Sequence, residues 1–274
     1  MNISINDKNK KVAFLDSGIG GLTVYAKFRN MLKTEDCIYF GDIKHLPYGN
    51  KSKEELVSYC VDIFDFFKSQ NVKAVVMACN TTSASAYPYL SKMYDFKIYP
   101  IIQSCAKIIA EHNYSSLGVL ATVSTAKSGA YETEIHKYRP DIKIYTQGCP
   151  KWADIAERQS QYDDKEIIKN DLDKILLYNP EKIILGCTHY PYLLDILSLY
   201  AERERFIDPA EFFVDYIKRD LEKSNLLNSQ ISPGSEEFFT SAETENFKNA
   251  AKMFYIVKDV QLKEFNKKTL LPNN

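Results

Sequence analysis

Two cysteines stand where a thiol could do acid/base chemistry. Cys79 ends the apolar run in "VVMACNTTSA", and Cys187 ends the one in "IILGCTHYP". Small hydroxyl and amide residues follow each cysteine, a pattern typical of a strand that passes into a helix. A helix N-terminus offers unpaired N–H groups and a partial positive charge, which lower the pKa of a thiol and bind carboxylates. The side chains predicted to join these N–H groups are those of Asn80, Thr81 and Thr188.

Two such thiols on opposite sides of one bound amino acid could remove an α-proton from one face and return a proton to the other. This would be racemisation or epimerisation without a cofactor. The alternative is that both cysteines are core residues, since free cysteine is among the most buried residue types. Their matching surroundings favour the chemical interpretation. Cys37 and Cys60 are predicted core residues, and the roles of Cys105 and Cys149 stay open.

A carboxylate and an imidazole stand at similar places in the chain. Asp16 ends an apolar run and is followed by the glycine-rich turn of "DSGIGGLT" (16–23), whereas His189 comes two residues after Cys187. The turn fits neither the dinucleotide nor the P-loop pattern. We expect it to bring backbone N–H groups to a carboxylate and to aim Asp16 at Cys79. His189 could assist Cys187 in the same way, and a lone Cys-x-His pair is weak support for a metal site.

The elements that must position these residues are short apolar runs alternating with amphipathic stretches. We predict strands at 11–17, 37–42, 74–79, 97–102, 117–122, 143–148, 182–187 and 205–210. Helices are predicted at 53–70 and 164–179, among others. Near-continuous apolar strands that alternate with helices indicate an α/β fold with mainly parallel sheets flanked by helices. Ligands bind such sheets at the carboxyl ends of the strands, where Ser17, Cys79, Thr122 and Cys187 stand.

A weak internal repeat predicts two similar halves. Ala121 lies 105 residues after Asp16, and Cys187 lies 108 residues after Cys79, each pair ending comparable apolar runs. We therefore expect two pseudo-symmetric domains with the active site between them. The first domain would comprise residues 1–103 and 212–274, because the C-terminal segment is expected to return to it. The second would comprise residues 104–211.

Composition excludes several classes of protein. The 274 residues carry 35 Lys and Arg against 36 Asp and Glu, so the net charge of −1 predicts no recruitment of nucleic acid or anionic membrane. The N-terminal stretch is polar, and no apolar stretch approaches the ~20 residues of a membrane span. The six cysteines include no CxxC pair, which argues against a disulfide framework or a zinc knuckle. We expect a cytoplasmic protein without a bound metal.

These residues together resemble the glutamate racemases of the aspartate/glutamate racemase superfamily. The matching motifs are "FLDSGIGGLTV", "YFGDIKHLPYG", "ACNTTSA", "ATVSTAKSGAY" and "GCTHYP", which run from about residue 12 to residue 191. Weaker similarity at "FFTSAETENFKNAA" extends the match toward the C-terminus. The resemblance implies interconversion of L- and D-glutamate without a cofactor, in a homodimer, with D-glutamate serving bacterial peptidoglycan.

The resemblance also assigns roles to particular residues. It implies that Cys79 and Cys187 are the acid/base thiols, with Asp16, His189 and Glu157 as assisting groups. The implied substrate contacts are Asp16, Ser17, Tyr48, Gly49, Asn80, Thr81, Thr122, Thr188 and His189. The chain departs from the family where Asp154 replaces the usual proline, Gln159 the usual glycine and His45 a frequent arginine.

Three other functions are consistent with parts of this sequence. The same chemistry could act on aspartate, because the sequence alone does not set the length of the pocket. The strand-end loops could instead form a non-catalytic module that binds an amino acid or a nucleotide. A metal site is the third possibility, and the spacing of the potential ligands makes it the weakest.

Overall fold

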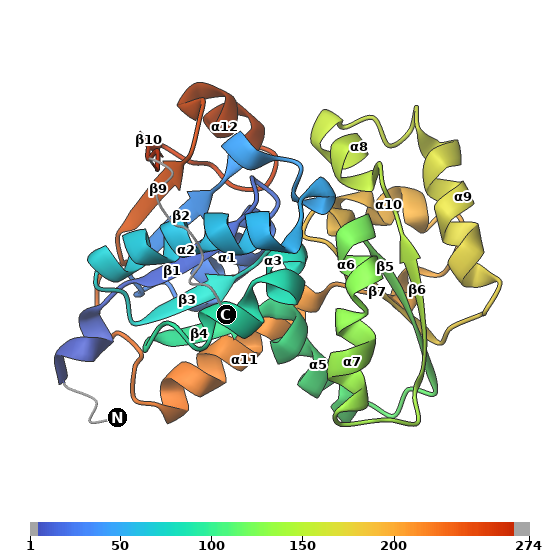
Figure 1. Cartoon of the computed structure of the whole chain (residues 1–274), viewed down its shortest axis with the longest axis horizontal. Helices are drawn as coiled ribbons and strands as arrows, with labels where there is room; N and C mark the ends of the chain where they lie inside the picture. The colour runs from blue at the N-terminus through green and yellow to red at the C-terminus, as the bar shows by residue number, and fades with distance from the viewer. Residues whose placement is uncertain (1–4, 266–274) are drawn as a thin grey trace.

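The computed structural model describes residues 5–265, which form two α/β halves side by side (Figure 1). The first sheet has six strands in the order β10-β9-β2-β1-β3-β4, and the second has four in the order β6-β5-β7-β8. The strands of the first sheet are β1 (Val12–Asp16), β2 (Cys37–Gly41), β3 (Ala74–Met77), β4 (Lys97–Pro100), β9 (Glu236–Thr240) and β10 (Gln261–Leu262). Those of the second are β5 (Ser116–Ala121), β6 (Lys143–Gly148), β7 (Lys182–Gly186) and β8 (Phe206–Ile207).

Both sheets are wholly parallel and share one topology. The order β2-β1-β3-β4 in the first sheet recurs as β6-β5-β7-β8 in the second. Asp16, at the end of β1, therefore corresponds to Ala121, at the end of β5. In the same way Cys79, after β3, corresponds to Cys187, after β7. The predicted fold class, two pseudo-symmetric α/β halves with parallel sheets flanked by helices, is confirmed.

Helices cover both faces of each sheet. Those beside the first sheet are α1 (Leu22–Met31), α2 (Lys53–Ser69), α3 (Asn80–Ser85), α4 (Tyr87–Leu90), α11 (Pro209–Lys223) and α12 (Thr244–Ala251). Those of the second half are α6 (Val123–Ser128), α7 (Ala130–His136), α8 (Trp152–Arg158), α9 (Lys165–Leu176) and α10 (Leu194–Leu197). Helix α5 (Ile101–Glu111) links the two halves, because it follows β4 and leads into β5.

Helix α2 shows how local sequence fixes an element of the first half. Ser52 and Glu55 form a reciprocal capping box, which satisfies two N–H groups at the start of the helix. Its predicted apolar stripe is buried, and Cys60 within that stripe has no exposed surface. Cys60 and Cys37 are therefore core residues, as predicted.

The C-terminal segment adds strands to the first sheet. Strand β9 pairs with β2, with Phe238 beside Tyr39, and β10 pairs with β9. The bounds of the two domains, 1–103 with 212–274 and 104–211, remain a prediction.

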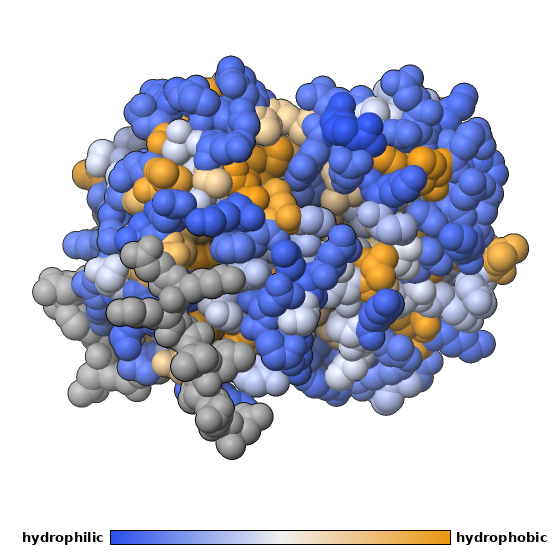
Figure 2. Space-filling model, turned by 45° about the horizontal axis from the view of Figure 1, so that its top comes forward, coloured by the Kyte–Doolittle hydropathy of each residue, from blue (hydrophilic) through white to orange (hydrophobic). Residues whose placement is uncertain are grey.

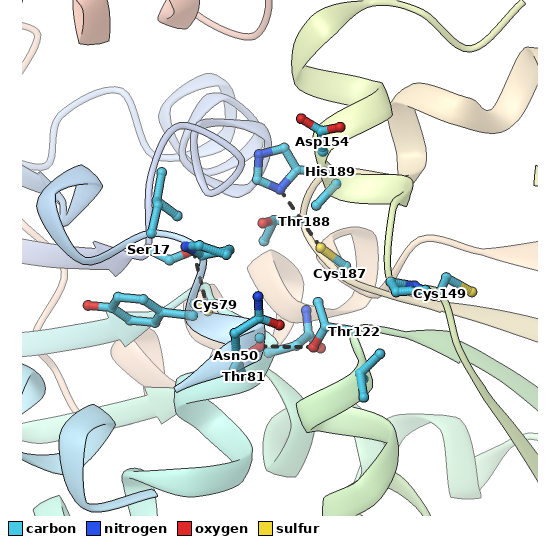
Figure 3. Close-up of a pocket in the computed structure, with 18 of the residues that line it drawn as sticks. Ser17, Asn50, Cys79, Thr81, Thr122, Cys149, Asp154, Cys187, Thr188 and His189 are labelled. Atoms are coloured by element: carbon cyan, nitrogen blue, oxygen red, sulfur yellow. Dashed lines mark hydrogen bonds between the residues drawn. The ribbon is translucent and has the colours of Figure 1, made fainter. Parts of the chain in front are cut away.

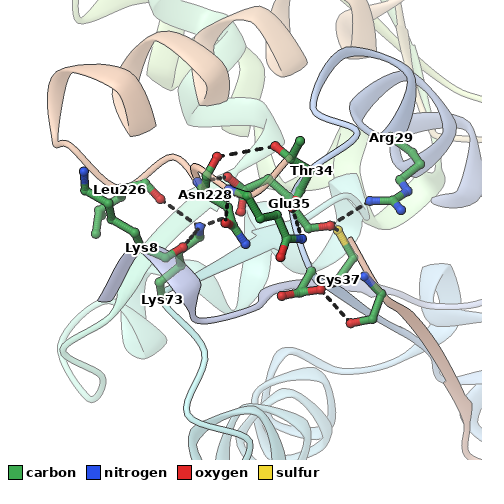
Figure 4. A network of polar contacts seen from close by, with 11 residues as sticks. Lys8, Arg29, Thr34, Glu35, Cys37, Lys73, Leu226 and Asn228 are labelled. Atoms are coloured by element: carbon green, nitrogen blue, oxygen red, sulfur yellow. Dashed lines mark hydrogen bonds and ion pairs between the residues drawn. The ribbon is translucent and has the colours of Figure 1, made fainter. Parts of the chain in front are cut away.

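A buried ion pair joins four segments of the chain at the edge of the first sheet where its strands begin (Figure 4). Lys73 Nζ lies 2.5 Å from Glu35 Oε2 and also donates to the carbonyl oxygens of Lys8 and Leu226. The Asn228 N–H donates to the other Glu35 oxygen at 2.7 Å. Removing one partner of such a pair costs about 3–5 kcal/mol, because the other charge is left buried. The pair holds the end of the sheet opposite the cysteines.

Polar residues cover most of the face drawn in Figure 2, and apolar residues show there in patches. Within residues 5–265, no helix has both the length and the apolar character needed to cross a membrane.

Candidate active site

A cavity of about 420 Å³ lies between the two halves, at the carboxyl ends of the strands (Figure 3). Its size is in the range of small-molecule sites. All of the predicted site residues except Asp16 line it: Ser17, Tyr48, Gly49, Cys79, Asn80, Thr81, Thr122, Glu157, Cys187, Thr188 and His189. The structure thus brings together residues that the sequence places far apart.

Several lining residues were not predicted from the sequence. These are Leu46, Pro47, Asn50, Val123, Cys149, Pro150, Ala153 and Asp154. Most of them flank a motif, since residues 46–50 surround "PYG" and residues 149–154 precede Glu157. Proximity to a motif was the only signal that could have found them.

The two cysteines with open roles are both buried. Cys149 packs in the apolar core of the second half, and Figure 3 shows its Sγ turned away from Cys187. Cys105 belongs to α5, packs in the hydrophobic core and donates to the carbonyl oxygen of Pro209. Neither thiol faces the cavity as Cys79 and Cys187 do.

The Cys79 thiol lies at the start of α3 and lines the cavity. Its Sγ is 3.8 Å from Ser17 Oγ, and the side chains of Tyr48, Leu56 and Tyr59 pack around it. Burial, together with the charge of Asp16, raises the pKa of Cys79 to about 12. The prediction of a lowered pKa is therefore wrong for Cys79 in the free protein, because desolvation outweighs the effect of a six-residue helix. Cys79 is a thiol, ready to donate a proton.

The Cys187 thiol is paired with a histidine. Its Sγ lies 3.8 Å from His189 Nδ1, and His189 Nε2 forms an ion pair with Glu157 Oε1 at 2.9 Å. Burial lowers the pKa of His189, but the contacts with Cys187 and Glu157 outweigh it and raise that pKa to about 10. An imidazolium therefore lies beside Cys187 at neutral pH. A helix follows Cys187 as expected, but it is a 3-10 helix that begins at Tyr190, three residues after the cysteine.

Replacing Glu157 by glutamine should lower the pKa of His189, since the variant loses the negative charge that stabilises the imidazolium. A pH titration of the His189 ring signals by NMR would measure this. In the wild type the ring should stay protonated through pH 6.5, the ordinary midpoint for histidine, and titrate near pH 10. An unchanged midpoint in E157Q would contradict the assignment.

Glu157 lies in the last turn of α8, and Gln159, which caps the end of this helix, has an unusual backbone conformation. Gln159 has a φ of 56°, in the left-handed region that favours glycine. The glycine that the family has at this position would adopt that conformation without strain, whereas glutamine costs about 1 kcal/mol. Asp154 pairs with Arg158 on the same helix at 2.9 Å. Despite both departures from the family, α8 presents Glu157 to His189.

Asp16 lies behind the cavity wall. Its carboxylate accepts hydrogen bonds from the Gly18 N–H at 3.0 Å and from Thr188 Oγ1 at 3.4 Å. Burial raises the pKa of Asp16 against the opposing charge of His189. The turn thus brings a backbone N–H group to a carboxylate, as expected, and that carboxylate belongs to Asp16 itself.

The glycine-rich turn also lets the two halves approach closely. A Cβ atom at Gly20 would lie 2.4 Å from His189 Cε1 and 2.5 Å from Thr188 Oγ1. Any side chain at this position would therefore displace the side chains of Thr188 and His189 from their places in the site.

Hydroxyl and amide groups form the polar wall between the thiols. Thr81 Oγ1 lies 3.1 Å from Thr122 Oγ1 and 3.2 Å from Thr125 Oγ1, which joins the two halves. Among the described residues no Lys or Arg lines the cavity. Carboxylate groups of a ligand would therefore be bound by hydroxyl, amide and backbone N–H donors.

A buried carboxylate holds the loop that carries Tyr48 and Gly49. Asp42 accepts a short hydrogen bond from the Tyr48 hydroxyl and contacts His45 Nδ1 at 2.8 Å. The ring of His45 stacks on Tyr59 at 3.8 Å. Where the family often has arginine, this chain thus has a histidine that contacts Asp42.

No group of three or more His, Cys, Asp or Glu side chains within residues 5–265 is arranged to hold a metal ion. The groups predicted to take part in acid/base chemistry are two thiols, one imidazole and two carboxylates. Fold and site therefore define an α/β protein whose thiol-lined site lies between two similar halves.

The match to a known family agrees with this description. Residues 19–217 match the family model for Asp/Glu/hydantoin racemases. The chain belongs to this family and is an amino-acid racemase, an isomerase.

Individual relatives cover nearly the whole chain. It is 36% identical over 251 residues to glutamate racemase 2 of Caldanaerobacter subterraneus, covering 89% of this chain and 93% of the relative. The crystal structure of Francisella tularensis glutamate racemase in complex with D-glutamate superposes with a TM-score of 0.85 at 29% identity, covering 94% and 98% of the two chains. The aspartate racemase of Picrophilus torridus has a TM-score of 0.50 at 15% identity, covering 76% and 93%, a likeness that shows the fold alone.

Proposed function

We propose that this protein interconverts L- and D-glutamate without a cofactor, with Cys79 and Cys187 as the two acid/base groups. The observation that carries the proposal is that two thiols from corresponding positions of the two halves line one cavity (Figure 3). The similarity to named glutamate racemases, one of them bound to D-glutamate, supports glutamate as the substrate.

The substrate would be held by hydrogen bonds rather than by cationic side chains. Asn80, Thr81, Thr122 and Thr188 provide donors for carboxylate oxygens on the wall between the thiols. Ser17, Tyr48 and Gly49 provide further contacts from the first half. Asp16, which lies behind the cavity wall close to Thr188 and Cys79, stabilises the ammonium group of the substrate through its negative charge.

The proton transfers require that one of the two cysteines is a thiolate and the other a thiol when the substrate binds. In one direction Cys187, as a thiolate beside the His189 imidazolium, takes the α-proton from one face of the substrate. Cys79, as a thiol, gives its proton to the opposite face of the resulting carbanion. The enantiomer leaves with Cys187 protonated and Cys79 deprotonated, and the other enantiomer reacts through the reverse transfers. Asp16 and His189 assist the thiols, and Glu157 keeps His189 charged.

Initial rates on the two enantiomers of glutamate and of aspartate would test the choice of substrate. We expect kcat/KM for glutamate to exceed that for aspartate by 10-fold or more, since a methylene group is worth about 1–3 kcal/mol in a fitted pocket. A higher kcat/KM for aspartate would contradict glutamate as the substrate but not the two-cysteine mechanism. A protein that binds glutamate yet turns over none of the four compounds would be a binding module.

We further propose that the protein is a cytoplasmic homodimer that supplies D-glutamate for peptidoglycan. The role requires that the protein forms D-glutamate inside the cell. Growth of a D-glutamate-requiring bacterium after introduction of the gene would support the role, and sedimentation of the purified protein would give its oligomeric state.

A further inference from the structure

We propose that Tyr131 is a positioning residue that orients the side-chain amide of Asn80 toward the substrate, an inference that rests on the proposed function. Its hydroxyl donates to Asn80 Oδ1 at 2.7 Å. Asn80 begins α3 in the first half, and Tyr131 belongs to α7 in the second. The hydrogen bond therefore joins the two halves, to which α3 and α7 belong (Figure 1), and Asn80 lines the cavity.

The surroundings of this hydrogen bond fix its direction. Tyr131 and Asn80 are 2% and 3% exposed. Burial raises the pKa of Tyr131 well above its ordinary value, so the hydroxyl keeps its proton to donate. An amide whose oxygen accepts from Tyr131 must point its nitrogen the other way. In the described part of the chain the Asn80 nitrogen donates to no protein acceptor, and the residue lines the cavity.

The ring of Tyr131 also packs against the strand that leads to Cys187. A Cβ atom at Gly186 would lie 3.1 Å from Tyr131 Cε2, a closer approach than most side chains allow. Gly186 directly precedes Cys187, and Asn80 directly follows Cys79. One buried side chain thus contacts the neighbours of both thiols.

Loss of the hydroxyl should free the amide to rotate. The Asn80 oxygen would lose its donor, and the two orientations of the amide would become similar in energy. About half of the molecules would then have the Asn80 oxygen rather than the nitrogen facing a carboxylate of the substrate. Because that contact is made in the ground state and the transition state alike, its loss should raise KM and leave kcat nearly unchanged.

The test compares Tyr131→Phe, Asn80→Ala and the double variant in glutamate racemisation. We expect Y131F to raise KM about tenfold, the factor for loss of a hydrogen bond to a charged group, with kcat within about twofold. In the N80A background the same change should have no further effect on KM, since Tyr131 acts through Asn80. Tyr99→Phe is the matched control, because Tyr99 is a similarly buried tyrosine of the first half whose hydroxyl donates to Asp220 at 2.7 Å. Y99F should leave KM unchanged.

Two results would overturn the inference. One is a wild-type KM in Y131F, and the other is an equal rise in KM with and without Asn80, which would mean that Tyr131 acts elsewhere. A crystal structure of unliganded Y131F gives a second readout that is independent of the substrate. The inference predicts that the Asn80 side chain rotates or takes two orientations, and an unmoved side chain would refute it even if glutamate were not turned over. Inactivity of the wild type would refute only the proposed function.

Discussion

Replacing either Cys79 or Cys187 by alanine should lower the rate of glutamate racemisation about 10³-fold or more, the range for loss of an essential acid/base group. Each variant lacks either the acceptor or the donor of a proton at one face of the substrate. Since both transfers are needed for inversion, the two variants should be equally impaired. Polarimetry or chiral chromatography of the product would measure the loss.

The two variants should still differ in a partial reaction. The remaining thiol can remove the α-proton from one enantiomer, exchange it with solvent and return it to the same face. In deuterated water, C79A should therefore exchange the α-proton of one enantiomer and C187A that of the other, without inversion. Cys105→Ala is the matched control, since this buried thiol contacts Pro209 rather than the cavity. Racemisation near the wild-type rate in C79A or C187A would contradict the two-base mechanism.

Replacing His189 by asparagine should lower kcat/KM about 10²-fold, because Cys187 would lose the imidazolium that supports its thiolate. L- and D-glutamate are equally stable, so the fall in kcat/KM must be the same in both directions. Unequal effects on the two faces should instead show as different changes in kcat for the two enantiomers. Steady-state kinetics from each enantiomer would measure both quantities.

The pH dependence gives His189 a distinctive signature. Its pKa is raised to about 10, so the imidazolium persists below that pH and is lost above it. The wild type should therefore show no fall in kcat/KM through pH 6.5 and a fall as the pH rises toward 10. E157Q should move this fall to lower pH, and H189N should lack it. A wild-type activity that falls near pH 6.5 would contradict an imidazolium at this position.

The architecture could be predicted because the strands are buried on both faces. Apolar runs such as 74–79 and 182–187 mark such strands directly, and the rule that ligands bind at the carboxyl ends of parallel strands then gathers Ser17, Cys79 and Thr188. The repeat offsets predicted two similar halves, and the two sheets share one strand order. The apolar runs and the repeat were therefore sufficient to predict most of the fold and most of the cavity wall.

Features that depend on how side chains pack across the halves could not be predicted. The pKa of Cys79 is raised, whereas we predicted that it is lowered, because burial and the charge of Asp16 act on the thiol. Neither the burial of Cys79 nor its proximity to Asp16 can be deduced from the residues around position 79. The contact of Tyr131 with Asn80 joins residues that are 51 positions apart. The sequence around Glu157 departs from the family at Asp154 and Gln159, so its motif did not indicate that this carboxylate contacts His189.

Incubation of the wild-type protein with L-glutamate in deuterated water tests the central claim most directly. The two-thiol mechanism predicts D-glutamate that carries deuterium at the α-carbon from the first turnovers, without added pyridoxal phosphate. Proton NMR of the α-position combined with chiral chromatography would follow both events. Folded protein that forms no D-glutamate from the L-enantiomer, or forms it without deuterium from solvent, would contradict it.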